Sequence, residues 1–83
     1  MTFTPDTTIY EWTFEFYSPT EEEWMDFGYW TLEDNRQFIT ETLIQDEDGN
    51  VEDLSVSVKE WTFEEFQQNQ GPDCLSLLRD YDG

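Results

Sequence analysis

The chain of 83 residues contains no histidine and no alanine, a single cysteine, and only three basic residues. The missing histidine removes the side chain that most often acts as a general acid or base and most often binds metal ions. The single cysteine, Cys74, rules out an internal disulfide, and a lone thiol is typical of a reducing compartment. These absences favour a cytoplasmic binding protein over an enzyme.

Long apolar runs and basic segments are also missing. No stretch is apolar enough to predict a membrane-spanning helix, and residues 1–6 lack the basic residue with which a signal peptide begins. An anionic membrane surface would repel the chain. Three cations are too few to neutralise nucleic-acid phosphates. We therefore expect neither membrane attachment nor direct binding of nucleic acid.

Acidic residues dominate instead, and 21 Asp and Glu give a formal net charge of −18. A carboxylate excess of this size opposes folding through self-repulsion, so it needs a reason. The simplest reason is a partner with a strongly basic surface. Two plainer explanations remain open. The acidic surface could serve only solubility, or the chain could be adapted to high salt, although fifteen aromatics and no alanine are atypical of halophilic proteins.

Aromatic residues make up 18% of the chain. A buried aromatic side chain removes roughly 150–250 Å² from water. Eight or nine such rings would support a compact core, so we predict one folded domain over residues 1–83 rather than a disordered acidic chain. The terminal segments, 1–7 and 80–83, are expected to be loosely ordered.

Three segments show the pattern of β-strands, at residues 8–17, 25–31 and 53–61. The first and third alternate apolar with polar side chains, and a period of two indicates a half-buried strand. In the second, Gly28 marks either a bulge or a close backbone approach. The side chains expected in the core are Tyr10, Trp12, Phe14, Leu54, Val56, Val58, Ile39 and Leu43.

A first helix is expected after the second strand, with Thr31 as its N-cap and the helix running to about residue 45. Leu32, Ile39 and Leu43 would share its buried side. The β-branched residues within 37–45 also fit a strand, so both structures remain open for that segment.

Further helices are expected near the C-terminus. Thr62 and Glu65 have the spacing of a capping box, and Pro72 would begin a last helix through Arg79. The expected fold is therefore α+β, a small antiparallel sheet of about three strands with two or three short helices in the order β-β-α-β-α.

Known catalytic and metal-binding patterns are not found. Carboxylates are abundant, but no pair stands out as the two distinct environments that glycoside hydrolysis needs. With Gly49 at the sixth position of an EF-hand loop, Ile44 and Ser55 would occupy the first and twelfth positions, where ligands are required. We expect no catalytic residue, no metal site and no cofactor.

The carboxylates themselves are the candidate binding groups, and they occur in clusters along the chain. Alternate residues of a strand lie roughly 6.5–7 Å apart, which is comparable to the phosphate spacing along one DNA strand. A rigid fold can therefore present carboxylates as a phosphate-like array. The candidate partner-binding residues are Glu21, Glu22, Glu23, Asp26, Glu33, Asp34, Asp46, Glu47, Asp48, Glu52 and Asp53. The sequence leaves open which cluster contacts the partner.

In size, acidity and mixed α/β pattern the chain resembles the acidic DNA-mimic proteins, which include phage anti-restriction and anti-CRISPR proteins. The resemblance covers the whole chain and is one of composition, with no family-specific motif. It implies a non-enzymatic inhibitor, a monomer or homodimer, that blocks the basic DNA- or RNA-binding surface of a host protein. The alternative is an acidic adaptor that binds a basic protein surface without mimicking nucleic acid.

Overall fold

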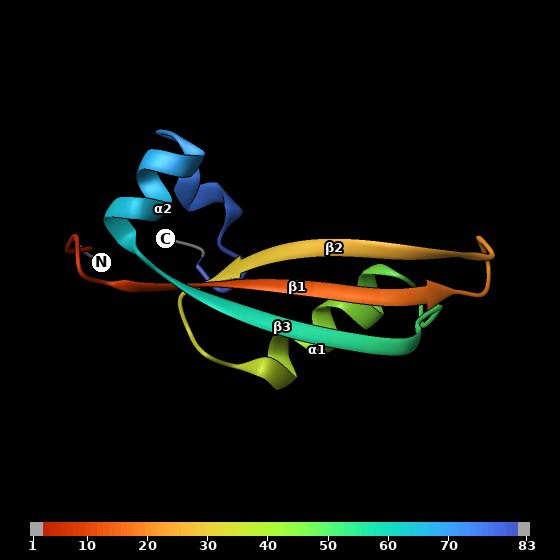
Figure 1. Cartoon of the computed structure of the whole chain (residues 1–83). Coiled ribbons are helices and arrows are strands. Elements are labelled where there is room, and N and C mark those ends of the chain that lie inside the picture. Colours follow the sequence, from red (N-terminus) through yellow and green to blue (C-terminus); the bar gives the residue numbers. More distant parts are fainter. Residues whose placement is uncertain (1–2, 82–83) are drawn as a thin grey trace.

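The computed structural model describes residues 3–81, and Figure 1 shows the arrangement of the chain. The expected α+β fold in the order β-β-α-β-α is confirmed, and each strand extends one or two residues beyond its predicted bounds. The elements are β1 (Thr8–Ser18), β2 (Glu23–Thr31), α1 (Arg36–Asp46), β3 (Glu52–Thr62), α2 (Phe63–Gln70) and a 3₁₀ turn, η1 (Cys74–Leu77).

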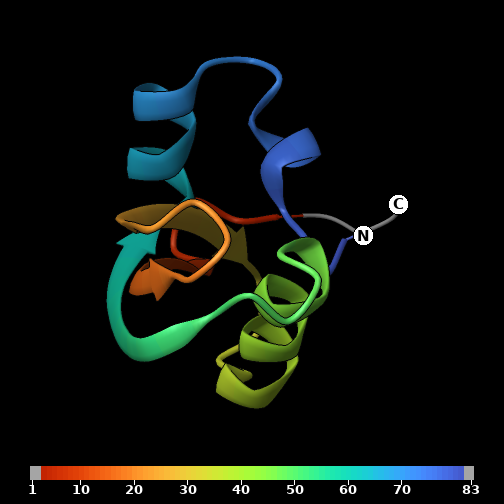
Figure 2. The ribbon, with the colours of Figure 1, turned by 90° about the vertical axis from the view of Figure 1, so that its right-hand side faces the viewer.

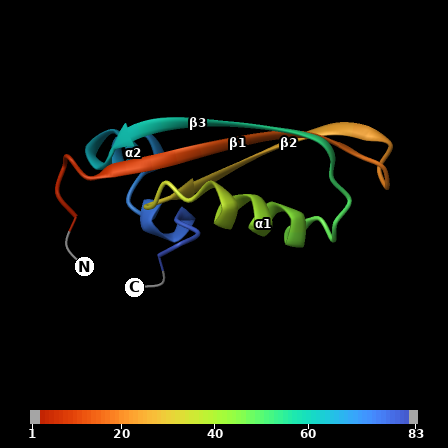
Figure 3. The ribbon, with the colours of Figure 1, turned by 90° about the horizontal axis from the view of Figure 1, so that it is seen from below.

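The central strand of the sheet is β1, which pairs antiparallel with β2 on one side and β3 on the other. Its inward side chains Trp12, Phe14 and Phe16 are at most 1% exposed. Helix α1 lies along this face of the sheet, as Figure 3 shows, and adds Ile39 and Leu43 to the cluster. The predicted inward face of the first strand is therefore confirmed.

Residues 37–45 are helical, but the predicted N-cap is wrong. Helix α1 follows Asn35, whose side chain accepts a hydrogen bond from the Phe38 N–H at 3.0 Å. Thr31 instead ends β2, where its hydroxyl accepts from the Trp12 indole N–H and donates to the Glu33 carbonyl, each at 2.8 Å. Thr31 belongs to β2, and its hydroxyl serves the Trp12 indole and the Glu33 carbonyl, while α1 begins only at Arg36.

Helix α2 and the C-terminal segment lie over the opposite face, at the end of the sheet away from the β1–β2 hairpin (Figure 1). They cover a second apolar cluster. The expected capping box at the start of α2 is confirmed, since Thr62 Oγ1 accepts from the Glu65 N–H and the Glu65 carboxylate accepts from the Thr62 N–H. Leu32, expected on the buried side of the first helix with Ile39 and Leu43, precedes α1 and packs against this second cluster instead. The buried members are Ile9, Phe66, Cys74 and Leu78.

The last expected helix, from Pro72 to Arg79, is reduced to the single turn η1. Leu78 leaves this turn in an extended conformation, and the Arg79 N–H donates to the Trp30 carbonyl at 2.9 Å. This short parallel bridge to the edge of β2 takes the chain out of helical geometry.

Val58 was expected in the core, but it is 48% exposed. It lies opposite Trp12 in the register of β1 and β3. Because β3 is an edge strand, α1 covers Trp12 while the Val58 side chain stays open to solvent.

Gly28 marks neither a bulge nor a close approach. The β1–β2 register is regular through it, and a Cβ there would meet its nearest neighbour, the Trp12 carbonyl oxygen, at an ordinary 3.8 Å. The irregularity lies on β3 instead, where the register shifts between Glu15 and Tyr17 and Asp53 has a φ of 53°.

The two ends of the described chain meet beside α2. Phe3 stacks on Phe63 with ring centroids 5.0 Å apart and packs edge-on against Tyr81 at 5.5 Å. Of the segments expected to be loosely ordered, residues 1–2 and 82–83 lie outside the described residues. Between residues 3 and 81, no helix has the length and apolar character needed to cross a membrane.

Replacing Trp12 with alanine should lower the free energy of unfolding by about 3–5 kcal/mol, because a fully buried indole is lost. Thr31→Val should cost about 1–3 kcal/mol by leaving the buried indole N–H without an acceptor. Urea unfolding followed by circular dichroism measures both. Trp24→Ala is the control, since that side chain is 65% exposed and should change stability by less than about 0.5 kcal/mol. Equal losses at Trp12 and Trp24 would contradict the assignment of the two sheet faces.

Candidate functional site

Two of the predicted acidic clusters lie at one end of the sheet. In the strand register Ser18 faces Glu23 and Tyr17 faces Glu52, so the β1–β2 hairpin and the α1–β3 turn are neighbours. Figure 2 looks onto this end. Adjacent strands are about 4.8 Å apart, which puts the two acidic segments about 10 Å apart across β1. We call this group the acidic end: Glu21, Glu22, Glu23, Glu47, Asp48, Glu52 and Asp53.

Glu33 and Asp34 lie at the opposite end of the sheet, in the loop after β2. Their charges, and that of Glu60 on β3, act on the hydroxyl of Tyr10. Partial burial, followed by the charges of Glu60, Asp34 and Glu33, raises the pKa of the Tyr10 hydroxyl. The structure therefore separates this smaller cluster from the acidic end.

Asp46, also predicted to contact a partner, is held by other residues of the chain. It accepts a hydrogen bond from the Tyr29 hydroxyl at 3.1 Å and forms a salt bridge with Arg79 at 3.3 Å. The Arg79 guanidinium also lies over the Tyr29 ring, 5.2 Å from its centroid. Burial, and then the hydrogen bond to Asp46, raises the pKa of Tyr29 to about 12. Asp46 therefore fastens α1 to β2 and to the C-terminal segment.

Backbone strain is concentrated at carboxylate-bearing residues. The three non-glycine residues with positive φ in the described chain are Glu22 at 56°, Asp48 at 53° and Asp53 at 53°. This left-handed region costs an L-residue roughly 1–2 kcal/mol, and Asp tolerates it better than Glu does. Glycine would relieve the strain at each position, yet all three carry a carboxylate and all three belong to the acidic end.

The C-terminus of α1 is also unfavourable for anions. The Gly49 N–H bonds the Ile44 carbonyl and the Asp48 N–H bonds the Gln45 carbonyl, which forms a Schellman motif with Asp48 in the left-handed position. The helix dipole makes this end negative and favours basic residues there. The last turn carries none, and Glu47 and Asp48 follow it. These carboxylates therefore reduce the stability of the helix they terminate.

Little positive charge offsets the acidic end. Across residues 3–81 the one salt bridge joins Arg79 to Asp46, while Lys59 lies over the Trp61 ring and Arg36 reaches the Val56 carbonyl. The body measures 42 × 21 × 20 Å. Of the net charge of −18, the charge of Asp82 lies outside the described residues, and the remaining 17 amount to about one charge per 2.5 Å of the long axis. Duplex DNA carries one per about 1.7 Å, which is a similar density.

The sheet also has an open face, on the side away from α1 and nearer the hairpin. Here Glu15 of β1 lies directly opposite Asp26 of β2. Glu15 is not among the candidate binding residues predicted from the sequence, and its pairing with Asp26 follows from the register of the hairpin. Like charges at directly opposed positions destabilise a sheet. The residues of the open face are Thr13, Glu15, Tyr17, Trp24, Asp26, Gly28, Ser55 and Ser57.

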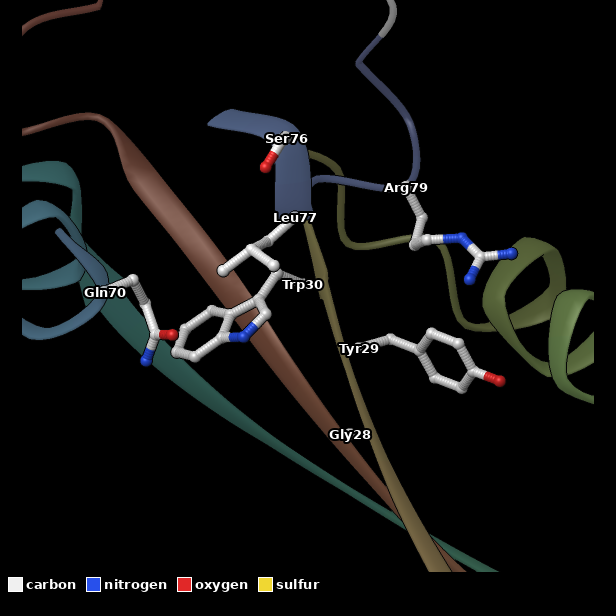
Figure 4. A pocket seen from close by; sticks show the side chains of 7 residues that line it. All are labelled: Gly28, Tyr29, Trp30, Gln70, Ser76, Leu77 and Arg79. Atoms are coloured by element: carbon white, nitrogen blue, oxygen red, sulfur yellow. The ribbon is translucent and has the colours of Figure 1, made fainter. Parts of the chain in front are cut away.

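A pocket of about 360 Å³ lies at the edge of β2 next to η1. In Figure 4, Tyr29 and Arg79 lie on one side of the strand, and Trp30, Leu77 and Gln70 lie on the other. The Arg79 guanidinium in this pocket is already paired with Asp46. The other lining residues do not include a nucleophile next to a base that could activate it. The lining residues are Gly28, Tyr29, Trp30, Gln70, Ser76, Leu77 and Arg79.

Within the described part of the chain, no three Cys, Asp or Glu side chains are grouped so that they could hold a metal ion. Cys74 is buried, as expected of a structural thiol. No protein-family model, curated protein or solved structure matches this chain.

The Tyr29–Asp46 contact predicts a loss of stability at high pH. The folded-state pKa of about 12 exceeds the ordinary value of 10.0, so the contribution is fully present below about 10 and is lost as the pH rises toward 12. Tyr29→Phe should remove this high-pH loss and cost about 1 kcal/mol at neutral pH. Denaturant unfolding across this range, with ultraviolet titration of tyrosinate, measures both effects. If Asp46→Asn leaves the pKa of Tyr29 unchanged, the hydrogen bond is not part of its cause.

The strain at Glu22 predicts a stabilising substitution. Glu22→Gly should raise the free energy of unfolding by about 1 kcal/mol, because glycine adopts positive φ without the steric penalty. Glu22→Gln removes the charge and keeps the strained backbone, so it separates the two effects in thermal and urea unfolding. Equal stabilisation by both substitutions would identify charge repulsion, rather than backbone strain, as the cost at this position.

Proposed function

We propose that the protein is an inhibitor that occupies the basic nucleic-acid-binding surface of another protein, with its carboxylates in the places of phosphates. The observation that carries the proposal is the gathering of two acidic segments, distant in sequence, at one end of an elongated body with no salt bridge among them in residues 3–81. The open face adds Glu15 and Asp26 beside this end.

The placement of the charges supports a role in binding. Glu22, Asp48 and Asp53 occupy strained backbone positions, and Glu47 and Asp48 follow the negative end of a helix dipole. Each arrangement lowers the stability of the free protein. A basic partner would relieve the repulsion and satisfy the carboxylates, so the stability lost in the free state becomes part of the driving force for binding.

The spacing is also suitable for replacing phosphates. Alternate residues on one face of a strand lie roughly 6.5–7 Å apart, and the acidic segments on the two sides of β1 are about 10 Å apart. A groove lined by Lys and Arg to follow a nucleic-acid backbone would meet carboxylates at comparable intervals. Electrostatic steering would make association fast and strongly dependent on salt.

Competition tests the proposal. The protein is immobilised and used to capture proteins from a bacterial lysate at low salt, and the captured partner is then challenged with duplex DNA and with RNA. We expect nucleic acid to displace the partner in proportion to its own affinity for it. Simultaneous binding of both ligands without mutual weakening would exclude mimicry and favour the acidic adaptor.

Matched variants locate the contact. The triple substitution Glu21→Gln, Glu22→Gln, Glu23→Gln should weaken binding by about 1.5–3 kcal/mol, at about 0.5–1 kcal/mol for each solvated ion pair, and should flatten the salt dependence. The control removes three charges at the opposite end of the sheet, through Glu33→Gln, Asp34→Asn and Glu60→Gln. It should mainly slow association. Equal effects of the two triple variants would show that net charge, not the acidic end, determines affinity.

A further inference from the structure

Trp24 is the exposed aromatic residue of the open face. Its side chain is 65% exposed, whereas the other three tryptophans are buried or half-buried. The Tyr17 ring packs against it edge-on, with centroids 5.9 Å apart and planes at 66°. Tyr17 thus holds the indole from one side while the rest of the ring stays open to a partner.

Two carboxylates lie beside this indole at close range. The Trp30 carbonyl accepts from the Arg79 N–H, so it points away from β1. In a strand with regular register, every second residue points its backbone N–H and C=O groups to the same side. Asp26, four residues before Trp30, therefore also points these groups away from β1. It thus forms a non-hydrogen-bonded pair with Glu15. In such pairs the two Cα atoms lie about 4.5 Å apart, and the side chains are closer together than in hydrogen-bonded pairs.

The indole and the carboxylates line one hollow of about 260 Å³, formed by Glu15, Trp24, Met25 and Asp26. The open face next to it carries small residues at Thr13, Gly28, Ser55 and Ser57, so a partner surface can approach closely. The hollow combines an aromatic face with two carboxylates that form no salt bridge within residues 3–81. This chemistry is complementary to a flat cation.

We propose that the hollow receives an arginine side chain of the basic partner, with the guanidinium over the Trp24 indole and its N–H groups donating to Glu15 and Asp26. The inference rests on the proposed function for the presence of such a partner. Arginine fits better than lysine because its planar group stacks on aromatic rings, is weakly hydrated and donates to two carboxylates at once. The acidic end would supply charge, and this hollow would supply specificity.

Peptide binding tests the inference without knowledge of the natural partner. A short peptide of alternating arginine and glycine is compared with its lysine counterpart, by calorimetry and by the NMR signal of the Trp24 indole N–H. We expect the arginine peptide to bind about twofold to fivefold more tightly and to shift that signal. Trp24→Ala should abolish the difference between the peptides. Because the Trp24 side chain is exposed, the variant should keep its fold, which circular dichroism checks directly.

Charge-matched variants isolate the hollow. Glu15→Gln with Asp26→Asn should weaken the arginine peptide about fivefold to tenfold and remove its advantage over lysine. Glu47→Gln with Asp48→Asn loses the same charge at the acidic end, and should weaken both peptides while keeping the advantage.

Three outcomes would overturn the inference. Equal binding of the two peptides by the unchanged protein would do so, as would an arginine preference that survives Trp24→Ala. Self-association that Trp24→Ala abolishes would instead identify a second copy of this chain as the occupant. The proposed function is tested by a different experiment. It fails if nucleic acid does not displace a captured partner, independently of the result of the peptide binding.

Discussion

Repulsion among carboxylates is the constraint on which this structure depends. Burial of the aromatic side chains on the inward face of β1 is the main contribution that opposes this repulsion. Trp12, Phe14 and Phe16 are buried beneath α1, and the Trp12 indole N–H is satisfied by Thr31 at 2.8 Å. The central strand therefore supplies aromatic burial without an unpaired polar group. Because the core is centred on this strand, the hairpin, the α1–β3 turn and the outward face near them are free to carry charge.

The positions of those charges argue against an acidic surface that serves solubility alone. Charges on exposed helix faces would keep the protein soluble without strain. Here Glu22 and Asp53 occupy left-handed backbone positions, Asp48 does so at a helix C-terminus, and Glu15 lies opposite Asp26 across two strands. Each placement lowers the stability of the free protein. Their concentration in one region is what an interaction surface with an oppositely charged partner would require.

Local patterns in the sequence predicted the elements well, and non-local geometry set the site. Alternation predicted the strands, and the spacing of Thr62 and Glu65 predicted the start of α2, because both signals are contained in a few adjacent residues. Thr31 was misassigned because it ends β2, where its hydroxyl serves a tryptophan from another strand, and α1 begins only at Arg36. The pairing of Glu15 with Asp26 was also inaccessible, since it follows from the register that the hairpin imposes.

A folded scaffold gives this acidic chain an advantage that a disordered acidic segment lacks. A flexible polyanion loses conformational entropy when a partner fixes its charges, and that loss reduces affinity. In this protein the sheet sets the spacing of the carboxylates in the free state, and the Tyr29–Asp46–Arg79 contacts fix the end of α1 from which the acidic turn extends. The edge-on packing of Tyr17 against Trp24 likewise supports the orientation of the indole ring. The aromatic core that overcomes the repulsion therefore also fixes the arrangement of the charged surface that we propose a partner recognises.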